Sequence, residues 1–182
     1  MWWHQNKVPL CRVDELALLE GQLARVVGRA TPSGELLAAP YTRRSCIAAA
    51  SMLEMVGSAV GHGGNSSNKV SGVDLASSFV LDDDSGLVAV LVSVSTIHLE
   101  LDLESVIQRP SADDRPLFGA NIVAHEIREA GGEWSHHSEA LIVAGDVIAA
   151  IGLVRKAEAG GYELVGTADK KLILTKHAEQ LV

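Results

Sequence analysis

Residues 21–56 read GQLARVVGRATPSGELLAAPYTRRSCIAAASMLEMV, and this stretch decides the fold. Residues 22–30 have the β-branched and apolar content of a strand, which leads into a Thr-Pro-Ser-Gly turn at residues 31–34. Gly28 within that strand permits a close approach of its neighbours. Residues 46–56 are small or apolar on both faces, which is typical of a central strand. The stretch therefore predicts β structure, and it contains no catalytic apparatus.

The residues on either side of this stretch predict a helix and a loop. Residues 13–20 form a short expected helix, with Asp14 at its N-cap and Gly21 just beyond its end. Residues 57–71 (GSAVGHGGNSSNKVS) are rich in Gly, Ser and Asn, and this composition predicts a flexible loop.

Two hairpins and several short strands are expected in the rest of the chain. The first hairpin joins residues 78–81 to residues 87–95, and the second joins residues 134–143 to residues 147–156. Each has a turn rich in Asp and Gly between its two strands. Residues 97–103 alternate between apolar and polar side chains, as a half-buried strand does. The remaining expected elements are a polar loop at residues 109–116, a helix at 121–130, and strands at 162–166 and 171–175.

Together these elements predict one mainly β (α+β) domain, either a curled antiparallel sheet or a small barrel, with one or two short helices. The domain spans residues 13–182, behind an N-terminal tail of residues 1–12. A chain of 182 residues is long enough for a substantial core. Because 47% of the residues are hydrophobic but only 4% are aromatic, we expect this core to be mainly aliphatic.

Charge and hydropathy limit the classes of partner. A formal net charge of −8 argues against nucleic acid, since binding a phosphate backbone needs a basic surface. No stretch reaches the roughly 18 charge-free apolar residues of a spanning helix, and the N-terminus lacks a signal-peptide core. We therefore expect a soluble cytoplasmic protein with a protein partner. Trp2 and Trp3 leave peripheral contact with a membrane surface open.

The cysteines and histidines offer little chemistry. Cys11 and Cys46 are too few for a disulfide scaffold or a four-thiolate zinc site, and buried reduced thiols are expected. His125 and Glu126 begin like a zinc-protease helix, but Glu129 stands where that motif needs a second histidine. A metal site built from His125, Glu129 and His136 stays open as an alternative. No metal and no cofactor are expected from the main interpretation.

Other candidate motifs fail on spacing or surroundings. The Gly-His-Gly-Gly sequence at residues 61–64 lacks the spacing of a phosphate-binding loop, and no Gly-x-Ser-x-Gly elbow occurs. The three aspartates at residues 82–84 indicate a solvated turn rather than a cation site. Cys46 lies in an apolar strand, where an inert thiol is expected. The sequence thus shows no catalytic constellation.

Three motifs, in order, resemble the GIDE domain, also called the BAM ("beside a membrane") domain. The first combines residues 27–40 (VGRATPSGELLAAP) with residues 43–47 (RRSCI). The second is the hairpin at residues 79–90 (FVLDDDSGLVAV), and the third is residues 139–152 (EALIVAGDVIAAIG). This domain is found in membrane-anchored RING-type E3 ubiquitin ligases of mitochondria and chloroplasts, and in bacterial proteins.

The resemblance implies an interaction module that recognises a partner, near a membrane in the ligases. Neither a RING nor transmembrane helices accompany the motifs here, so ubiquitin transfer is not implied. Ser45 and the alanines at residues 48–50 replace a proline and an aromatic residue of the family pattern. The prediction is a non-catalytic protein-interaction or adaptor module, with recognition expected in the loops at residues 57–71 and 109–116. The alternatives are a metal-dependent hydrolase, and a structural subunit of a homo-oligomer or larger complex.

Overall fold

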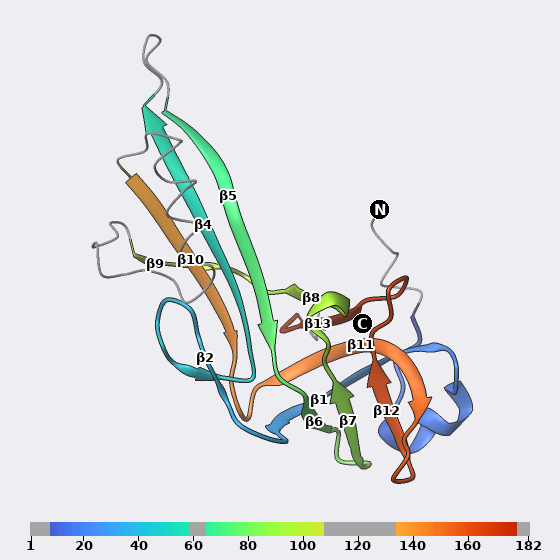
Figure 1. The fold of residues 1–182 in the computed structure, drawn as a ribbon. Helices are drawn as coiled ribbons and strands as arrows, with labels where there is room; N and C mark the ends of the chain where they lie inside the picture. Colours follow the sequence, from blue (N-terminus) through green and yellow to red (C-terminus); the bar gives the residue numbers. More distant parts are fainter. Residues whose placement is uncertain (1–7, 59–64, 108–133, 178–182) are drawn as a thin grey trace.

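A closed barrel of five strands forms the body of the protein (Figure 1). The structure is a computed structural model that describes residues 8–58, 65–107 and 134–177. Around the barrel the order is β1 (Leu23–Pro32), β6 (Phe79–Asp82), β7 (Leu87–Leu91), β12 (Tyr162–Val165) and β11 (Val147–Lys156). Pairing of β1 with β11 closes the ring, and only β7 and β12 run parallel. The expected β-rich fold with a small barrel is confirmed.

Two further strands and two short helices complete the body. β13 (Leu172–Thr175) pairs with β11, and β8 (Ile97–Glu100) pairs with β13. The helices are of the 3-10 type, η2 (Val13–Leu19) before β1 and η3 (Val94–Thr96) before β8. Leu16 of η2 is fully buried and belongs to the barrel core.

The barrel interior is filled by aliphatic side chains at alternate strand positions. Ala24, Val26 and Ala30 of β1 are fully buried, as are Ile148 and Ala150 of the paired strand β11. Such alternation is what a strand with one buried face requires. The expectation of a mainly aliphatic core is confirmed, because aromatic residues contribute only one fully buried side chain, Phe79, within the described ranges.

Gly28 of β1 lies close to the backbone of Asp82, the last residue of β6. A Cβ atom at this position would lie 2.6 Å from the carbonyl oxygen and 2.9 Å from the carbonyl carbon of Asp82. Both contacts involve backbone atoms, so a side chain could be accommodated only if one of the strands moved. The expectation that Gly28 permits close strand packing is confirmed.

A four-stranded sheet projects from the barrel, and we call it the arm (Figure 1). Its order is β5 (Asn65–Ala76), β4 (Ala48–Ser58), β10 (Trp134–Ile142) and β9 (Glu104–Ile107). The arm is continuous with the barrel, because β5 leads into β6 and β10 leads into β11. At its base the Ile47 amide donates to Ile142 O at 2.8 Å, and the Ser77 amide donates to Ile47 O at 2.9 Å.

A small hairpin covers one side of the arm base. It consists of β2 (Leu37–Ala38) and β3 (Ser45–Cys46). Beneath it Ala39, Cys46 and Ala49 form a second buried cluster. This packing fixes the loop between β2 and β3 against the arm.

Two sequence predictions about the arm are wrong. Residues 65–71 belong to β5, although the segment 57–71 was expected to be a loop. Antiparallel pairing with β4, from Ala48–Ala76 to Ser58–Asn65, compensates for the low strand propensity of the Ser, Asn and Gly residues. Residues 59–64 lie outside the described ranges.

The second wrong prediction is the hairpin of residues 134–156. β10 pairs with β4 in the arm, whereas β11 pairs with β1 in the barrel. The turn between them is docked on the barrel instead, because the Gly145 amide donates to Ala30 O at 2.8 Å and Arg29 donates to Gly145 O at 2.8 Å. The turn therefore joins two sheets.

The other predicted elements are confirmed with changed limits. The hairpin around residues 82–86 forms as β6 and β7, and Gly21, with φ of 78°, follows the first helix. The N-cap of that helix is Arg12, not Asp14, and its amide donates to the Glu15 carboxylate at 3.0 Å. The strand expected at residues 22–30 continues to Pro32, and the strand expected at residues 97–103 ends at Glu100. The strand expected at residues 46–56 is interrupted at Ile47. The expected helix at 121–130 and the loop at 109–116 lie outside the described residues.

Candidate functional site

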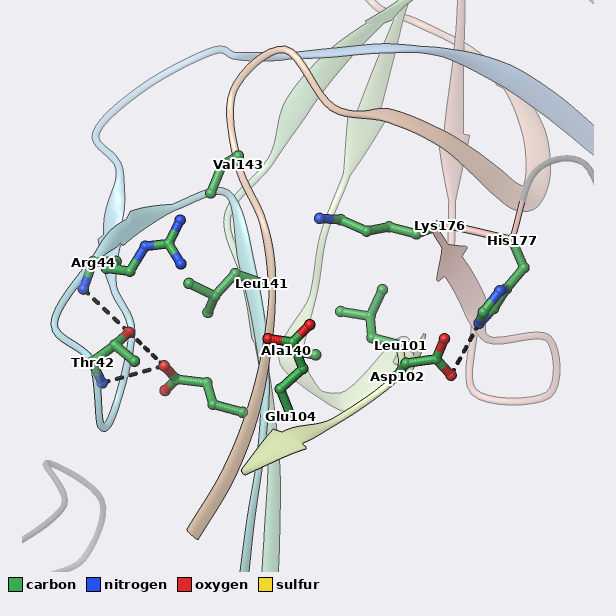
Figure 2. A pocket seen from close by; sticks show the side chains of 11 residues that line it. Thr42, Arg44, Leu101, Asp102, Glu104, Ala140, Leu141, Val143, Lys176 and His177 are labelled. Atoms are coloured by element: carbon green, nitrogen blue, oxygen red, sulfur yellow. Dashed lines mark hydrogen bonds and ion pairs between the residues drawn. The ribbon is translucent and has the colours of Figure 1, made fainter. Parts of the chain in front are cut away.

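A hollow of about 500 Å³ lies at the base of the arm, and we call it the basal hollow (Figure 2). Four separate parts of the chain enclose it: the β2–β3 loop, the connection from β8 to β9, the end of β10, and the segment after β13. Its lining residues are Thr42, Arg44, Leu101, Asp102, Glu104, Glu139, Ala140, Leu141, Val143, Lys176 and His177.

Among the residues that the structure describes, one edge of β10 has no strand partner where it borders the basal hollow. β9 pairs with β10 only at residues 137–139, whereas β4 continues along the opposite edge as far as Ile142. Residues 140–142 therefore have no strand partner on the β9 side among the residues that the structure describes. Beyond them, the Val143 amide is already bonded to the Asp146 carboxylate at 2.8 Å. The unpaired edge is thus three residues long.

Glu139 holds the β2–β3 loop against β10. Its side chain is buried, with 4% exposure, and its carboxylate accepts hydrogen bonds from the Tyr41 amide at 2.9 Å and the Thr42 amide at 3.2 Å. The hydroxyl groups of Thr42, at 2.5 Å, and Ser51, at 3.5 Å, complete the set. A buried carboxylate is tolerated when donors surround it in this way. Glu139 therefore positions the loop that carries Arg44.

Cationic side chains occupy the part of the basal hollow nearer Val143. Figure 2 shows the Arg44 guanidinium reaching in from the β2–β3 loop and the Lys176 ammonium reaching in from the opposite wall. Lys176 Nζ lies 2.7 Å from Asp146 Oδ2. The structure gives the Arg44 guanidinium no ion pair within the described ranges.

Carboxylates occupy the part nearer the first residue of β9. Glu104 is exposed and points toward the middle of the basal hollow, and Asp102 lies beside it (Figure 2). Asp102 Oδ1 is 3.4 Å from His177 Nε2. The cationic side chains of Arg44 and Lys176 therefore lie toward Val143, and the carboxylates of Glu104 and Asp102 lie farther from it (Figure 2).

The phenol of Tyr41 and the thiol of Cys46, both near the basal hollow, have raised pKa values, which favour their neutral forms. Burial and, to a smaller extent, the Glu139 carboxylate raise the pKa of Tyr41. The same two causes raise the pKa of Cys46 to about 11. The Cys46 thiol donates to Leu37 O at 3.6 Å and is fully buried. These properties agree with the expectation of an inert thiol.

None of the site residues proposed from the sequence is among the described residues that line the basal hollow. His125 and Glu129 lie outside the described residues, as do Trp2 and Trp3. His136 is on β10 opposite Glu54, and His137 is opposite Leu53. No group of three or more His, Cys, Asp or Glu side chains that could hold a metal ion occurs in the described part of the chain.

Sequence reasoning missed the basal hollow. Glu139 carries the one visible signal, because it is a carboxylate followed directly by three apolar residues, 140–142, in the same strand. Arg44, Glu104 and Lys176 carry none, since isolated charged residues near strand ends are ordinary surface features. Only the tertiary fold brings them to one place.

Comparisons with models of protein families, with curated proteins and with solved structures find no match. Among the described residues, no helix is long and apolar enough to cross a membrane.

Proposed function

We propose that this protein is a non-catalytic interaction or adaptor module, which binds a partner protein by strand addition in the basal hollow. The observation that carries this proposal is the β10 edge at residues 140–142, which lies inside a charged hollow and has no strand partner in the described part of the chain. An extended peptide that adds to a sheet edge gains main-chain hydrogen bonds, and the side chains around it give specificity. An open edge in a recess is accessible to such a segment but shielded from pairing with a broad sheet.

The GIDE/BAM resemblance supports the same function. Its third motif, residues 139–152, supplies Glu139, the unpaired edge and the Gly145-Asp146 turn, and its first motif supplies Arg44. The motifs that resemble the family thus form walls of the basal hollow as well as scaffold. A role as an adaptor near a membrane is what the resemblance implies.

Site-specific photo-crosslinking in cells tests the proposal. A photoreactive amino acid at position 44 or 104 is expected to crosslink the same partner, and mass spectrometry then identifies that partner and the linked peptide. The matched control is position 158, an exposed site in the turn between β11 and β12. Equal crosslinking from all three positions, or none from positions 44 and 104, would contradict partner binding in the basal hollow.

Two further measurements separate the alternatives that the sequence leaves open. Stoichiometric zinc or iron in the purified protein would favour the metal-dependent hydrolase. A stable homo-oligomer in light scattering, together with absent crosslinks to other proteins, would favour a structural subunit.

A further inference from the structure

We infer that the segment bound in the basal hollow is the C-terminal tripeptide of the partner, with Lys or Arg as its first residue. This inference rests on the proposed function, and it names the ligand class of the same site. Three features support it: the length of the unpaired β10 edge, the end of that edge at Val143, and the charges around the basal hollow.

The length follows from the unpaired edge. Residues 140–142 span about 10 Å of strand at roughly 3.3 Å per residue, which matches three residues of an added strand. At one end of this edge, β9 already pairs with Glu139 through its first residue, Glu104. A longer segment would have to displace β9 or leave the sheet.

The other end of the unpaired β10 edge, at Val143, indicates that the bound peptide ends there. The Val143 amide is bonded to Asp146, and the chain then turns into β11, which pairs with the barrel. A strand that continued past Val143 would find no further sheet edge to pair with among residues 8–58, 65–107 and 134–177. A chain terminus stops here without leaving its backbone groups unsatisfied, so a C-terminal segment fits better than an internal one.

The charges around the basal hollow indicate the direction of the bound peptide and the side chain of its first residue. A terminal carboxylate placed near Val143 meets Arg44 and Lys176, and Arg in particular can bind a carboxylate through two parallel hydrogen bonds. The first residue of the tripeptide then lies next to Glu104 and Asp102, whose carboxylates favour Lys or Arg. The bound segment therefore runs parallel to β10.

Fluorescence polarisation with the full-length chain tests this inference. The probes are labelled octapeptides with free C-termini, in which the third residue from the end is Lys, Arg, Glu or Ala and the last two vary over all residues. Saturable binding is expected only for members of the Lys and Arg sets. Amidation of the C-terminus is expected to weaken binding at least about 10-fold, the effect of losing one charge-assisted hydrogen bond.

Charge-reversal variants locate the two ends of the peptide. Arg44→Glu is expected to weaken binding of the free-carboxylate peptides at least about 10-fold. Glu104→Lys is expected to reverse the preference, so that the Glu peptides bind more tightly than the Lys peptides. Lys156→Glu and Glu158→Lys change exposed charges at the β11–β12 end and are expected to leave affinity unchanged. Circular dichroism and thermal unfolding confirm that each variant is folded.

Several results would overturn the inference. These are a lack of saturable binding by every set, equal binding of amidated peptides, or a Glu104→Lys variant that keeps the Lys preference. If none of these peptides binds but positions 44 and 104 still crosslink one partner, the proposed function stands and the C-terminal ligand is wrong. If both experiments fail, both proposals are wrong.

Discussion

The Thr42 hydroxyl donates a 2.5 Å hydrogen bond to Oε2 of Glu139, a residue 97 positions later in the chain. Together with the amide bonds from Tyr41 and Thr42, this contact ties the β2–β3 loop to the buried end of β10. One carboxylate thereby sets the shape of one wall of the basal hollow.

Replacement of Glu139 by Ala is expected to lower the free energy of unfolding by about 2–4 kcal/mol, because several partly buried donors lose a charged acceptor. Glu139→Gln keeps one carbonyl acceptor, so its free energy of unfolding is expected to lie between those of the wild type and Glu139→Ala. Urea denaturation measures the effect. Glu158→Ala, in an exposed turn, is the control and is expected to change the midpoint little. Equal midpoints for Glu139→Ala and the control would show that the carboxylate does not anchor the loop.

The second prediction concerns Gly28. Gly28→Ala places a Cβ atom 2.6 Å from Asp82 O and is expected to destabilise the barrel by about 1–3 kcal/mol. Gly34→Ala is the matched control, because a Cβ there meets nothing within 4 Å. Gly34→Ala is expected to be neutral or slightly stabilising, since it reduces the entropy of the unfolded chain. Thermal unfolding of both variants checks the difference, and equal shifts would argue against a close β1–β6 approach.

Local patterns predicted the elements that local chemistry determines. The Asp-Asp-Asp-Ser-Gly turn at residues 82–86 specifies its hairpin because Asp83 accepts the amides of Ser85 and Gly86 at 2.9 Å and 3.2 Å. Alternation over residues 97–103 predicted the buried positions Ile97 and Leu99 correctly, but it was wrong for Leu103, which lies beyond the end of β8 and is exposed. In these cases the residues that decide the structure are neighbours in the sequence.

The features that sequence reasoning missed depend on distant residues. Whether β10 pairs with β11 or with β4 is decided by contacts such as Arg29 with Gly145, which no turn motif reveals. The polar β5 becomes a strand because β4 supplies its hydrogen bonds. The basal hollow brings together Arg44, Glu104 and Lys176 from three segments, so no spacing rule could find it.

The third prediction concerns alkaline stability. Burial, followed by nearby carboxylates, raises the pKa of both Cys11 and Cys46 from 9.0 to about 11. Between these two values the unfolded chain binds fewer protons than the folded one, so the free energy of unfolding falls as pH rises from 9 to 11. Urea denaturation across this range measures the loss.

The matched variant is Cys11→Ala with Cys46→Ala. It is expected to be less stable at pH 7, because two buried side chains are shortened, but to lose less stability between pH 9 and 11. Tyr41, whose pKa is also raised, leaves a residual slope in both proteins. If the free energy of unfolding falls equally with pH in the two proteins, the loss of stability does not come from the thiols.

The last prediction concerns Asp83, which joins η2 to the β6–β7 turn. Its Oδ2 accepts the Val13 amide at 2.8 Å, and its Oδ1 accepts the Ser85 hydroxyl at 2.6 Å. Burial acts to raise the pKa of Asp83, but these bonds and those from the Ser85 and Gly86 amides outweigh it and lower the pKa below 3.8. The folded state therefore favours the carboxylate, and its stabilisation is present above pH 3.8 and lost as pH falls through the lowered value.

Asp83→Asn removes this dependence while keeping the side-chain size. At pH 7 it is expected to lower Tm by roughly 2–4 °C, the shift that about 1 kcal/mol produces in a domain of this size. The difference from the wild type is expected to shrink as pH falls below 3.8, because protonation removes the advantage of the carboxylate. Asp84→Asn is the control: Asp84 is exposed with φ of 68°, a conformation that asparagine tolerates well, so no loss is expected. A constant Tm difference between wild type and Asp83→Asn at all pH values would mean that these contacts stabilise the fold without favouring the charge.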